Sequence, residues 1–386
     1  MSATIDTSAG TPILQFGTSR FLQAHADLFI SEALAQGKAL GRVTVVQTTD
    51  NPGSSARVKA LATGAAYPVH IQGIDNGKVI DEVRWSSSVS GALRAAEDWP
   101  LIRQRFVWDA QVVISNTADT GYVVSDLDTP EALQASAPAP ASFPAKLLVL
   151  LHDRWQANPA APLSLFPCEL VSRNGEVLRE LVVSIAQAWA LAPSFITYLR
   201  TTCRWANSLV DRIVPQALDP VGAVAEPYAL WAIERQEGLV LPCEHPAIVV
   251  TDALDHYEHF KLFMLNLGHT WLAERWRVDG RDPEETVHHA MNDPALRQGL
   301  ESLWEDEVLP VFAARGCLAE ARDYLASVRD RFLNPYVRHP LADIARNHEE
   351  KKRRRFLPIV EMARRQLPGL EQPRLAAALR GDRSTP

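Results

Sequence analysis

The chain has 386 residues, and at about 150 residues per domain this length suggests two or three domains. Its 39 basic and 46 acidic residues give a formal net charge of −7, which argues against a nucleic-acid-binding protein because such proteins usually carry a basic surface. Apolar residues make up 47% of the chain and no apolar run is long enough to cross a membrane, so we expect a globular, cytoplasmic protein.

The first 190 residues alternate between strand and helix patterns. Short apolar, β-branched runs predict buried strands, and longer segments with helical periodicity predict helices. The expected strands are residues 13–16, 43–46, 111–115 and 163–170, and the expected helices are residues 21–36 and 143–155. An Asn-Gly pair at residues 76–77 predicts a hairpin between strands at 69–72 and 78–80. This alternation indicates an α/β fold with a mostly parallel, doubly wound sheet.

After Pro193 the pattern changes to helical segments broken by prolines, with residues 247–250 as one isolated strand. We therefore expect a mostly α-helical C-terminal domain. The expected boundary separates a domain of residues 1–193 from one of residues 194–386.

The first strand ends in a turn with one glycine. A dinucleotide site needs a strand, a tight glycine turn and a helix N-terminus, because the pyrophosphate binds free backbone N–H groups there. Gly17 has the place of the first glycine, Ser19 can cap the helix, and Arg20 can reach a phosphate. The residues of this candidate turn are Phe16, Gly17, Thr18, Ser19, Arg20 and Phe21. Because the motif has one glycine where the full fingerprint has three, an ordinary strand–helix turn is an equal alternative.

Two further strands end in polar residues that would border the same cleft. Asp50 follows the second strand, where a carboxylate binds the ribose 2′-hydroxyl and repels a 2′-phosphate. Arg57 is the opposing signal, because an arginine can accept the 2′-phosphate of NADP. Asn116 and Thr117 follow the strand at 111–115, and ligands bind beyond the carboxyl ends of such strands.

Three polar side chains interrupt a mostly apolar segment between residues 257 and 270. On an α-helix, Asn266 lies about 140° and His269 about 80° from Lys261, so the three share one sector. Burial lowers the pKa of a lysine and makes it a usable base, asparagine can donate to an alkoxide, and histidine can orient a hydroxyl. This set suits alcohol–ketone chemistry without a metal. The equally weighted alternative is a lysine that reaches the surface and an Asn–His pair that satisfies itself in a core.

Several motifs in chain order resemble the polyol-specific long-chain dehydrogenases, the mannitol dehydrogenase family. The pattern formed by Lys261, Asn266 and His269 resembles the catalytic signature of that family. Further similar segments are residues 115–117, 142–147, 207–215, 226–228 and 331–335. Features that resemble the hexuronate branch, with its tagaturonate and fructuronate reductases, are residues 15–17, 167–170, 334–341, 351 and 355–358.

The resemblance implies a Rossmann-type N-terminal domain, a helical C-terminal domain, NAD as cofactor and no metal. It implies that Lys261 is the general acid/base, that Asn266 is an oxyanion-hole donor, and that His269 is a polar group of the substrate site.

The same resemblance implies further residues that bind the substrate. Asp211 is a second polar group of the substrate site, and Lys351 lies where polyol-oxidising members have a substrate-binding arginine. A second oxyanion-donating asparagine is expected near residues 168–175, and Asn174 is the only asparagine there. Residues 168–170 depart from the family pattern, reading Cys-Glu-Leu where mannitol-type members have Cys-Asp-Asn.

Other patterns are weighed against simpler explanations. His256 and His259 could bind a metal with a nearby aspartate, but such pairs are more often surface features. The basic run 351–355 has acidic neighbours, which favours a solvated helix face; we expect Lys351 to face the site and the other four to stay outside. The four cysteines form no CxxC pair, which argues against a disulfide framework or a zinc site.

The resulting hypothesis is an NAD-dependent oxidoreductase, a monomer or dimer. It interconverts a linear polyol or a sugar acid of the altronate or mannonate type and its keto form of the tagaturonate or fructuronate type. A neutral-polyol 2-dehydrogenase of the mannitol or arabinitol type is the first alternative. The second is a non-catalytic Rossmann protein that senses redox state, which the degenerate glycine turn favours and the Lys–Asn–His set opposes.

Overall fold

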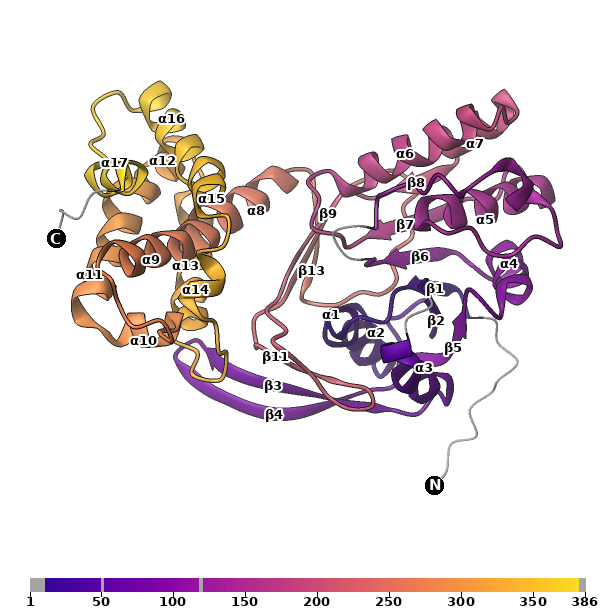
Figure 1. The fold of residues 1–386 in the computed structure, drawn as a ribbon, viewed down its shortest axis with the longest axis horizontal. Helices are drawn as coiled ribbons and strands as arrows, with labels where there is room; N and C mark the ends of the chain where they lie inside the picture. Colours follow the sequence, from indigo (N-terminus) through magenta and orange to yellow (C-terminus); the bar gives the residue numbers. More distant parts are fainter. Residues whose placement is uncertain (1–10, 50–51, 118–120, 382–386) are drawn as a thin grey trace. The chain divides into compact units, whose positions relative to one another are not determined.

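The computed structural model describes residues 11–49, 52–117 and 121–381, and the chain divides into two compact units (Figure 1). Unit 1 consists of Met1–His70, Val83–Ala225 and Ala229–Leu254. Unit 2 consists of Ile71–Glu82, Glu226–Tyr228 and Asp255–Pro386. The boundary that the sequence favours near residue 193 falls inside unit 1, and the described chain becomes all-helical from Leu254 onward.

Unit 1 is built on a six-stranded parallel sheet with the order β5-β2-β1-β6-β7-β8. Its strands are β1 (Ile13–Phe16), β2 (Val43–Gln47), β5 (Val89–Arg94), β6 (Val112–Ser115), β7 (Leu163–Pro167) and β8 (Cys203–Trp205). Four of these strands are buried over their whole length, as expected for a parallel sheet covered by helices. Numbered along the chain, the strands follow the 3-2-1-4-5-6 order of dinucleotide-binding sheets, which confirms the predicted fold class.

Helices cover this sheet, and one group of them shares a hydrophobic core with strands β1, β6 and β7. That group is α4 (Trp99–Trp108), α5 (Phe143–Ala157), α6 (Asn174–Ala188) and α7 (Pro193–Thr201). The other helices of unit 1 are α1 (Arg20–Ala24), α2 (Ala26–Leu34) and α3 (Ser55–Ala62), with short 3₁₀ turns at Pro52–Ser54 and Pro130–Leu133.

The first expected helix is interrupted. Residues 21–36 were expected to form one helix, but the backbone leaves the helical region at His25, with φ −119° and ψ −95°. The His25 ring lies against Phe21 and Phe29, with centroid distances of 4.7 and 4.6 Å. Two distant residues meet the chain at the break: Arg212 donates to the carbonyl of Ala24 at 2.5 Å, and the ring of Trp231 lies 5.7 Å from that of His25. The apolar periodicity does not reveal these contacts.

The expectation that strands nearly vanish after residue 193 is wrong. The additional strands are β9 (Ser208–Asp211), β10 (Gln216–Ala217), β11 (Ala223–Ala225), β12 (Leu230–Glu234) and β13 (Ile248–Thr251). The segment expected to be an isolated strand instead pairs in parallel with β12. Strands of two to five residues are too short to show a clear alternation of apolar and polar residues.

The Asn-Gly hairpin is confirmed and is longer than expected. Strands β3 (Tyr67–Asp75) and β4 (Lys78–Ser86) belong to a sheet with the order β10-β11-β3-β4. Asn76 and Gly77 have φ values of 50° and 72°, the left-handed conformations that a tight hairpin turn requires.

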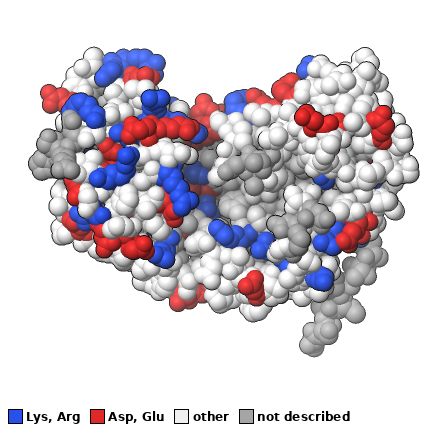
Figure 2. Space-filling model, viewed as in Figure 1, with Lys and Arg blue, Asp and Glu red and all other residues white. Residues whose placement is uncertain are grey.

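Unit 2 is mostly helical, and its helices enclose a second hydrophobic core. The helices are α8 (Leu254–Phe260), α9 (Leu267–Val278), α10 (Val287–Asn292), α11 (Pro294–Ser302), α12 (Leu309–Ala314), α13 (Leu318–Phe332), α14 (Leu341–Ile344), α15 (His348–Arg355), α16 (Leu357–Gln366) and α17 (Pro373–Arg380), with π-helical turns η3 (Lys261–Asn266) and η4 (Leu303–Val308). Charged side chains of both signs crowd the visible face of this unit, whereas most of the visible face of unit 1 is uncharged (Figure 2).

Within the described ranges, no helix has the length and apolar character that crossing a membrane requires.

Candidate active site

The turn after β1 passes so close to the end of β6 that it requires a glycine. Gly17 has a φ of +121°, and a Cβ atom there would lie 2.5 Å from the carbonyl oxygen of Asn116. The Gly17 N–H donates to the carbonyl of Val46 at the end of β2, at 3.0 Å. The carboxyl ends of β1, β2 and β6, which line the cleft of a dinucleotide-binding sheet, therefore meet at Gly17.

Ser19 joins the start of the first helix to the end of β6. Its hydroxyl accepts the N–H of Leu22 at 3.3 Å, which caps helix α1, and lies 3.3 Å from the Oδ1 of Asn116 as a donor. Asn116 in turn donates its side-chain amide to the carbonyl of Cys168 at 2.8 Å. The predicted capping role of Ser19 is confirmed.

The two arginines near the turn have partners within the protein. Arg57 donates to the carbonyl of Thr18 at 3.3 Å, so it supports the glycine turn. Arg20 donates its Nε to the carbonyl of Val214 at 2.9 Å, and Phe21 stacks on His25. Asp50, the residue expected to select NAD, lies outside the described residues.

Glu169, which the sequence analysis noted only as a departure from a family triplet, organises the end of β6. Its buried carboxylate accepts the hydroxyl of Ser115 at 3.1 Å, the N–H and hydroxyl of Thr117 at 3.0 Å each, and the hydroxyl of Tyr122 at 3.3 Å. Burial raises the pKa of Glu169, and these hydrogen bonds partly offset the rise. A polar residue within two positions of the end of a buried strand was the available signal, as it was for Asn116.

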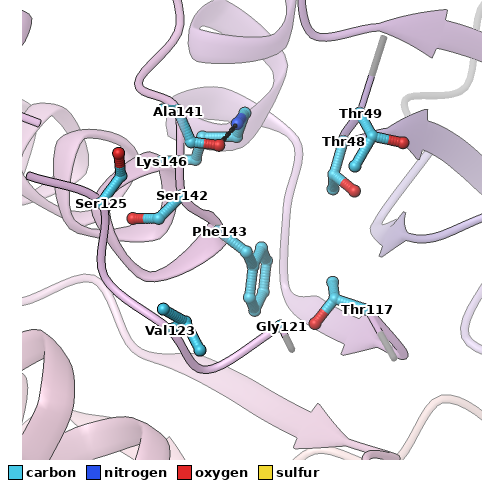
Figure 3. A pocket seen from close by; sticks show the side chains of 10 residues that line it. All are labelled: Thr48, Thr49, Thr117, Gly121, Val123, Ser125, Ala141, Ser142, Phe143 and Lys146. Carbon is cyan, nitrogen blue, oxygen red and sulfur yellow. Dashed lines mark hydrogen bonds between the residues drawn. The ribbon is translucent and has the colours of Figure 1, made fainter. Parts of the chain in front are cut away.

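A cavity of about 360 Å³ opens at the ends of β2 and β6. Thr48 and Thr49 lie on one side of it, and Ser142, Phe143 and Lys146 lie on the other (Figure 3). Lys146 donates to the carbonyl of Ala141 at 2.7 Å, and burial lowers its pKa to about 8. The cavity lies where a doubly wound sheet binds its ligand.

Two candidate substrate residues belong to unit 1. Asn174 is fully buried and donates its side-chain amide to the carbonyls of Pro167, Glu169 and Ser208 at 2.9–3.1 Å. Its amide therefore holds the loop after β7 in place and has no N–H left for a substrate oxyanion. Asp211 is buried at the end of β9, opposite Leu230 of β12.

In unit 2, Lys261 and Asn266 are the first and last residues of the π-helical turn η3. The sequence predicts an α-helix here, on which these two residues would be about 140° apart. Hydrogen bonds in a π-helix join residues five apart, so the wider turn brings these two side chains closer to one face. Both residues are half-buried, whereas the apolar residues between them are mostly buried. Single π turns inside helices are frequent at functional sites.

His269 lies one turn further, on α9. Its ring stacks on Phe332 at 4.3 Å and meets the ring of His339 edge to face at 4.7 Å. Burial lowers the pKa of His269 well below its ordinary value, and the neighbouring His339, Arg331 and Arg355 add to this effect. The imidazole is therefore neutral near pH 7 and can both donate and accept a hydrogen bond.

Helix α15 places two cations beside these residues. Lys351 donates to the carbonyl of Ile344 at 2.7 Å. Arg355 donates its Nη1 to the carbonyl of Asn266 at 3.2 Å and to the hydroxyl of Thr270 at 2.7 Å. The expectation that only Lys351 of the basic run turns inward is wrong, because Arg355 is one helical turn away on the same face.

Lys352 also departs from that expectation. It is buried and bonds to Glu274 at 3.2 Å, next to the 2.6 Å contact between Glu274 and His348. Among the residues that the structure describes, no three His, Cys, Asp or Glu side chains are grouped as metal ligands would be.

Residues 11–240 match the family model of the mannitol dehydrogenase Rossmann domain, and residues 253–379 match that of the mannitol dehydrogenase C-terminal domain. An altronate oxidoreductase of Halalkalibacterium halodurans is 31% identical over 369 residues, which are 90% of this chain and 69% of the relative. One of Bacillus subtilis is 31% identical over 373 residues, 90% of this chain and 74% of the relative.

Two solved structures are similar over 97% of the chain. A substrate-free D-sorbitol dehydrogenase has a TM-score of 0.82, is 21% identical and is covered over 80% of its length. The Pseudomonas fluorescens mannitol 2-dehydrogenase, solved with NAD and D-mannitol, has a TM-score of 0.72, is 19% identical and is covered over 78%. At these identities the two structures indicate a common fold.

Proposed function

Because this chain belongs to the mannitol dehydrogenase family, we propose that it is an NAD-dependent oxidoreductase that interconverts a linear polyol or sugar acid and its keto form. The family resemblance inferred from the motifs is thereby confirmed. Within this activity we propose a sugar acid of the altronate or mannonate type, since the relatives at 31% identity are altronate oxidoreductases. A cytoplasmic location and a monomeric or dimeric state remain predictions.

The observation that carries this proposal is the π turn. It combines the side-chain amine of Lys261, the amide of Asn266 and, one turn on, the neutral imidazole of His269. In the oxidation, the neutral amine of Lys261 takes the proton of the substrate hydroxyl and becomes an ammonium, while the C–H hydrogen would leave as hydride to NAD⁺. Asn266 donates to the oxygen as negative charge develops on it. His269 and Asp211 bind neighbouring hydroxyls.

The residues of unit 1 fit NAD. The close approach at Gly17, with no room for a Cβ atom, is the tight turn that a dinucleotide needs. We propose that the turn from Phe16 to Phe21, together with Asn116, Thr117 and Asp50, holds the cofactor, which accepts the hydride. The amide and ammonium groups of the π turn supply the charge stabilisation, so the proposed chemistry requires no metal.

A substrate panel tests the proposal. Purified protein with NAD is offered altronate, mannonate, mannitol and arabinitol, and NADH formation is followed by absorbance. We expect oxidation of at least one sugar acid, with a kcat/KM above that for the neutral polyols. Faster oxidation of mannitol or arabinitol would favour the neutral-polyol alternative. Binding of NADH without turnover of any substrate, in either direction, would favour the redox sensor.

A further inference from the structure

We propose that Arg355 binds the carboxylate of the sugar-acid substrate and thereby separates acids from neutral polyols, with Lys351 as the second cation. This inference rests on the proposed function and deepens it by assigning the residue that recognises the acid. It also revises the sequence-based expectation, in which Lys351 was the one residue of the basic run that faces the site.

Lys351 and Arg355 differ from Lys352 and Arg354 of the same helix in having no carboxylate partner among the described residues. Lys352 has Glu274 and Glu349 at 3.2 and 3.4 Å, and Arg354 has Glu350 at 3.7 Å. No carboxylate of the described residues lies within ion-pair distance of Lys351 or Arg355. Basic and acidic side chains lie intermixed on the visible face of unit 2 (Figure 2).

Two like charges one helical turn apart repel each other, and both are partly buried. Lys351 and Arg355 are at i and i+4 of α15, an arrangement that destabilises a helix unless an anion compensates it. Burial is the main cause that lowers the pKa of Arg355 to about 10, and it also lowers the pKa of Lys351. A bound carboxylate would relieve both the repulsion and the cost of burial.

Arg355 has the free donors that a carboxylate needs. Its Nη1 serves the carbonyl of Asn266 and the hydroxyl of Thr270, whereas its Nε and Nη2 have no partner in the described part of the chain. Neither of these nitrogens is fully buried. A guanidinium edge of this kind binds both oxygens of a carboxylate at once, which an ammonium cannot do.

The position of Arg355 relates it to the proposed chemistry. Its guanidinium lies against the last residue of the π turn that begins with Lys261, and its charge acts on the rings of His269 and His339. Asp343 is the acidic group that acts on His339, and it is paired with Arg346 at 2.7 Å. Asp343 therefore does not neutralise the guanidinium of Arg355, and its positive charge beside the π turn can bind an anionic ligand.

The test compares altronate with mannitol in Arg355→Gln. One charged hydrogen-bond interaction is worth about ten- to a hundredfold, so we expect the KM for altronate to rise by this factor and that for mannitol to change less than about twofold. Arg353→Gln, the same change on an exposed position of the same helix, is the control and should leave both values unchanged. Lys351→Met should shift the altronate KM in the same direction by a smaller factor.

Further measurements keep the outcomes separate. Arg355→Lys retains the positive charge but cannot bind both carboxylate oxygens at once. Its KM for altronate should lie between those of the unchanged protein and Arg355→Gln, and this variant serves as the test if Arg355→Gln folds poorly. Calorimetric titration with altronate measures binding without turnover. Binding that depends on Arg355 in a protein with no activity would overturn the proposed function and support this inference. Equal effects on both substrates, or no binding of altronate to the unchanged protein, would overturn the inference.

Discussion

The Oε1 atom of Glu169 accepts two hydrogen bonds from Thr117, one from its N–H and one from its hydroxyl, each 3.0 Å long. The second oxygen accepts the hydroxyls of Ser115 and Tyr122. One buried side chain at the end of β7 thus holds the end of β6, where Thr117 lines the cavity of unit 1. The cofactor cleft depends on a residue that contributes nothing to the glycine turn itself.

Replacement of Glu169 by leucine should weaken NADH binding by about five- to a hundredfold, because the N–H of Thr117 loses its buried acceptor at a cost of about 1–3 kcal/mol. Glu169→Gln should stay within about threefold, since its oxygen can serve Thr117 and its amide can donate to the two hydroxyls. Fluorescence titration with NADH measures both. Equal weakening in the two variants would show that the negative charge, and not the acceptor, matters.

Gly17→Ala should destabilise the protein and weaken NADH binding. A non-glycine residue in a disfavoured backbone region costs about 1–3 kcal/mol, and here the Cβ would also meet the Asn116 carbonyl at 2.5 Å. Gly37 is the control, because its φ is also positive, at +69°, but nothing lies within 4 Å of its Cβ position. Gly37→Ala should cost less unfolding free energy and leave NADH affinity unchanged; similar urea unfolding curves and NADH affinities would contradict this.

Lys261→Ala should lower kcat by about 10² to 10⁴ and leave the NADH dissociation constant unchanged, because a general base acts in the proton transfer and not in cofactor binding. Steady-state kinetics and NADH fluorescence measure the two effects separately. Near-normal turnover would remove Lys261 from the mechanism.

Asp27 makes the stability of the protein depend on pH. It is fully buried, its Oδ2 accepts the hydroxyl of Tyr67 at 2.8 Å, and burial raises its pKa from 3.8 to about 7. Folding therefore favours the protonated form, so the stability that Asp27 contributes is complete below pH 4 and is lost as the pH rises to about 7.

Asp27→Asn removes this titration and keeps an oxygen for Tyr67. At about 1.4 kcal/mol per pKa unit, the variant should exceed the unchanged protein in unfolding free energy at pH 8 by up to about 4 kcal/mol, with a smaller excess at pH 5. Urea unfolding at the two pH values measures this. A difference that does not vary with pH would contradict the assignment.

The enzyme should prefer NAD to NADP, because the carboxylate of Asp50 repels a 2′-phosphate. Asp50→Ser should reduce the ratio of the two kcat/KM values by raising that for NADP. A preference of the unchanged protein for NADP would instead indicate that Arg57 leaves Thr18 to bind the phosphate.

The sequence by itself determined the features that depend on local pattern. Buried strands, the Asn-Gly hairpin and helix α5 follow from side-chain periodicity and turn chemistry, which act over a few neighbouring residues. Several motifs in chain order, among them the pattern of Lys261, Asn266 and His269, resemble the mannitol dehydrogenase family, and the family models confirm that resemblance.

Only the tertiary structure decided the features that depend on contacts between distant segments. The break at His25 and the strands between residues 203 and 251 are set by packing and pairing with partners far along the chain. The same holds for the site. The side-chain amide of Asn174 donates to three carbonyls, and Glu169 accepts hydroxyls from β6 and from the loop after it. Arg355 donates to the carbonyl of Asn266 in the π turn, 89 residues away. Hydrogen bonds and charge pairs form between groups that are close in space, and sequence spacing says little about such neighbours.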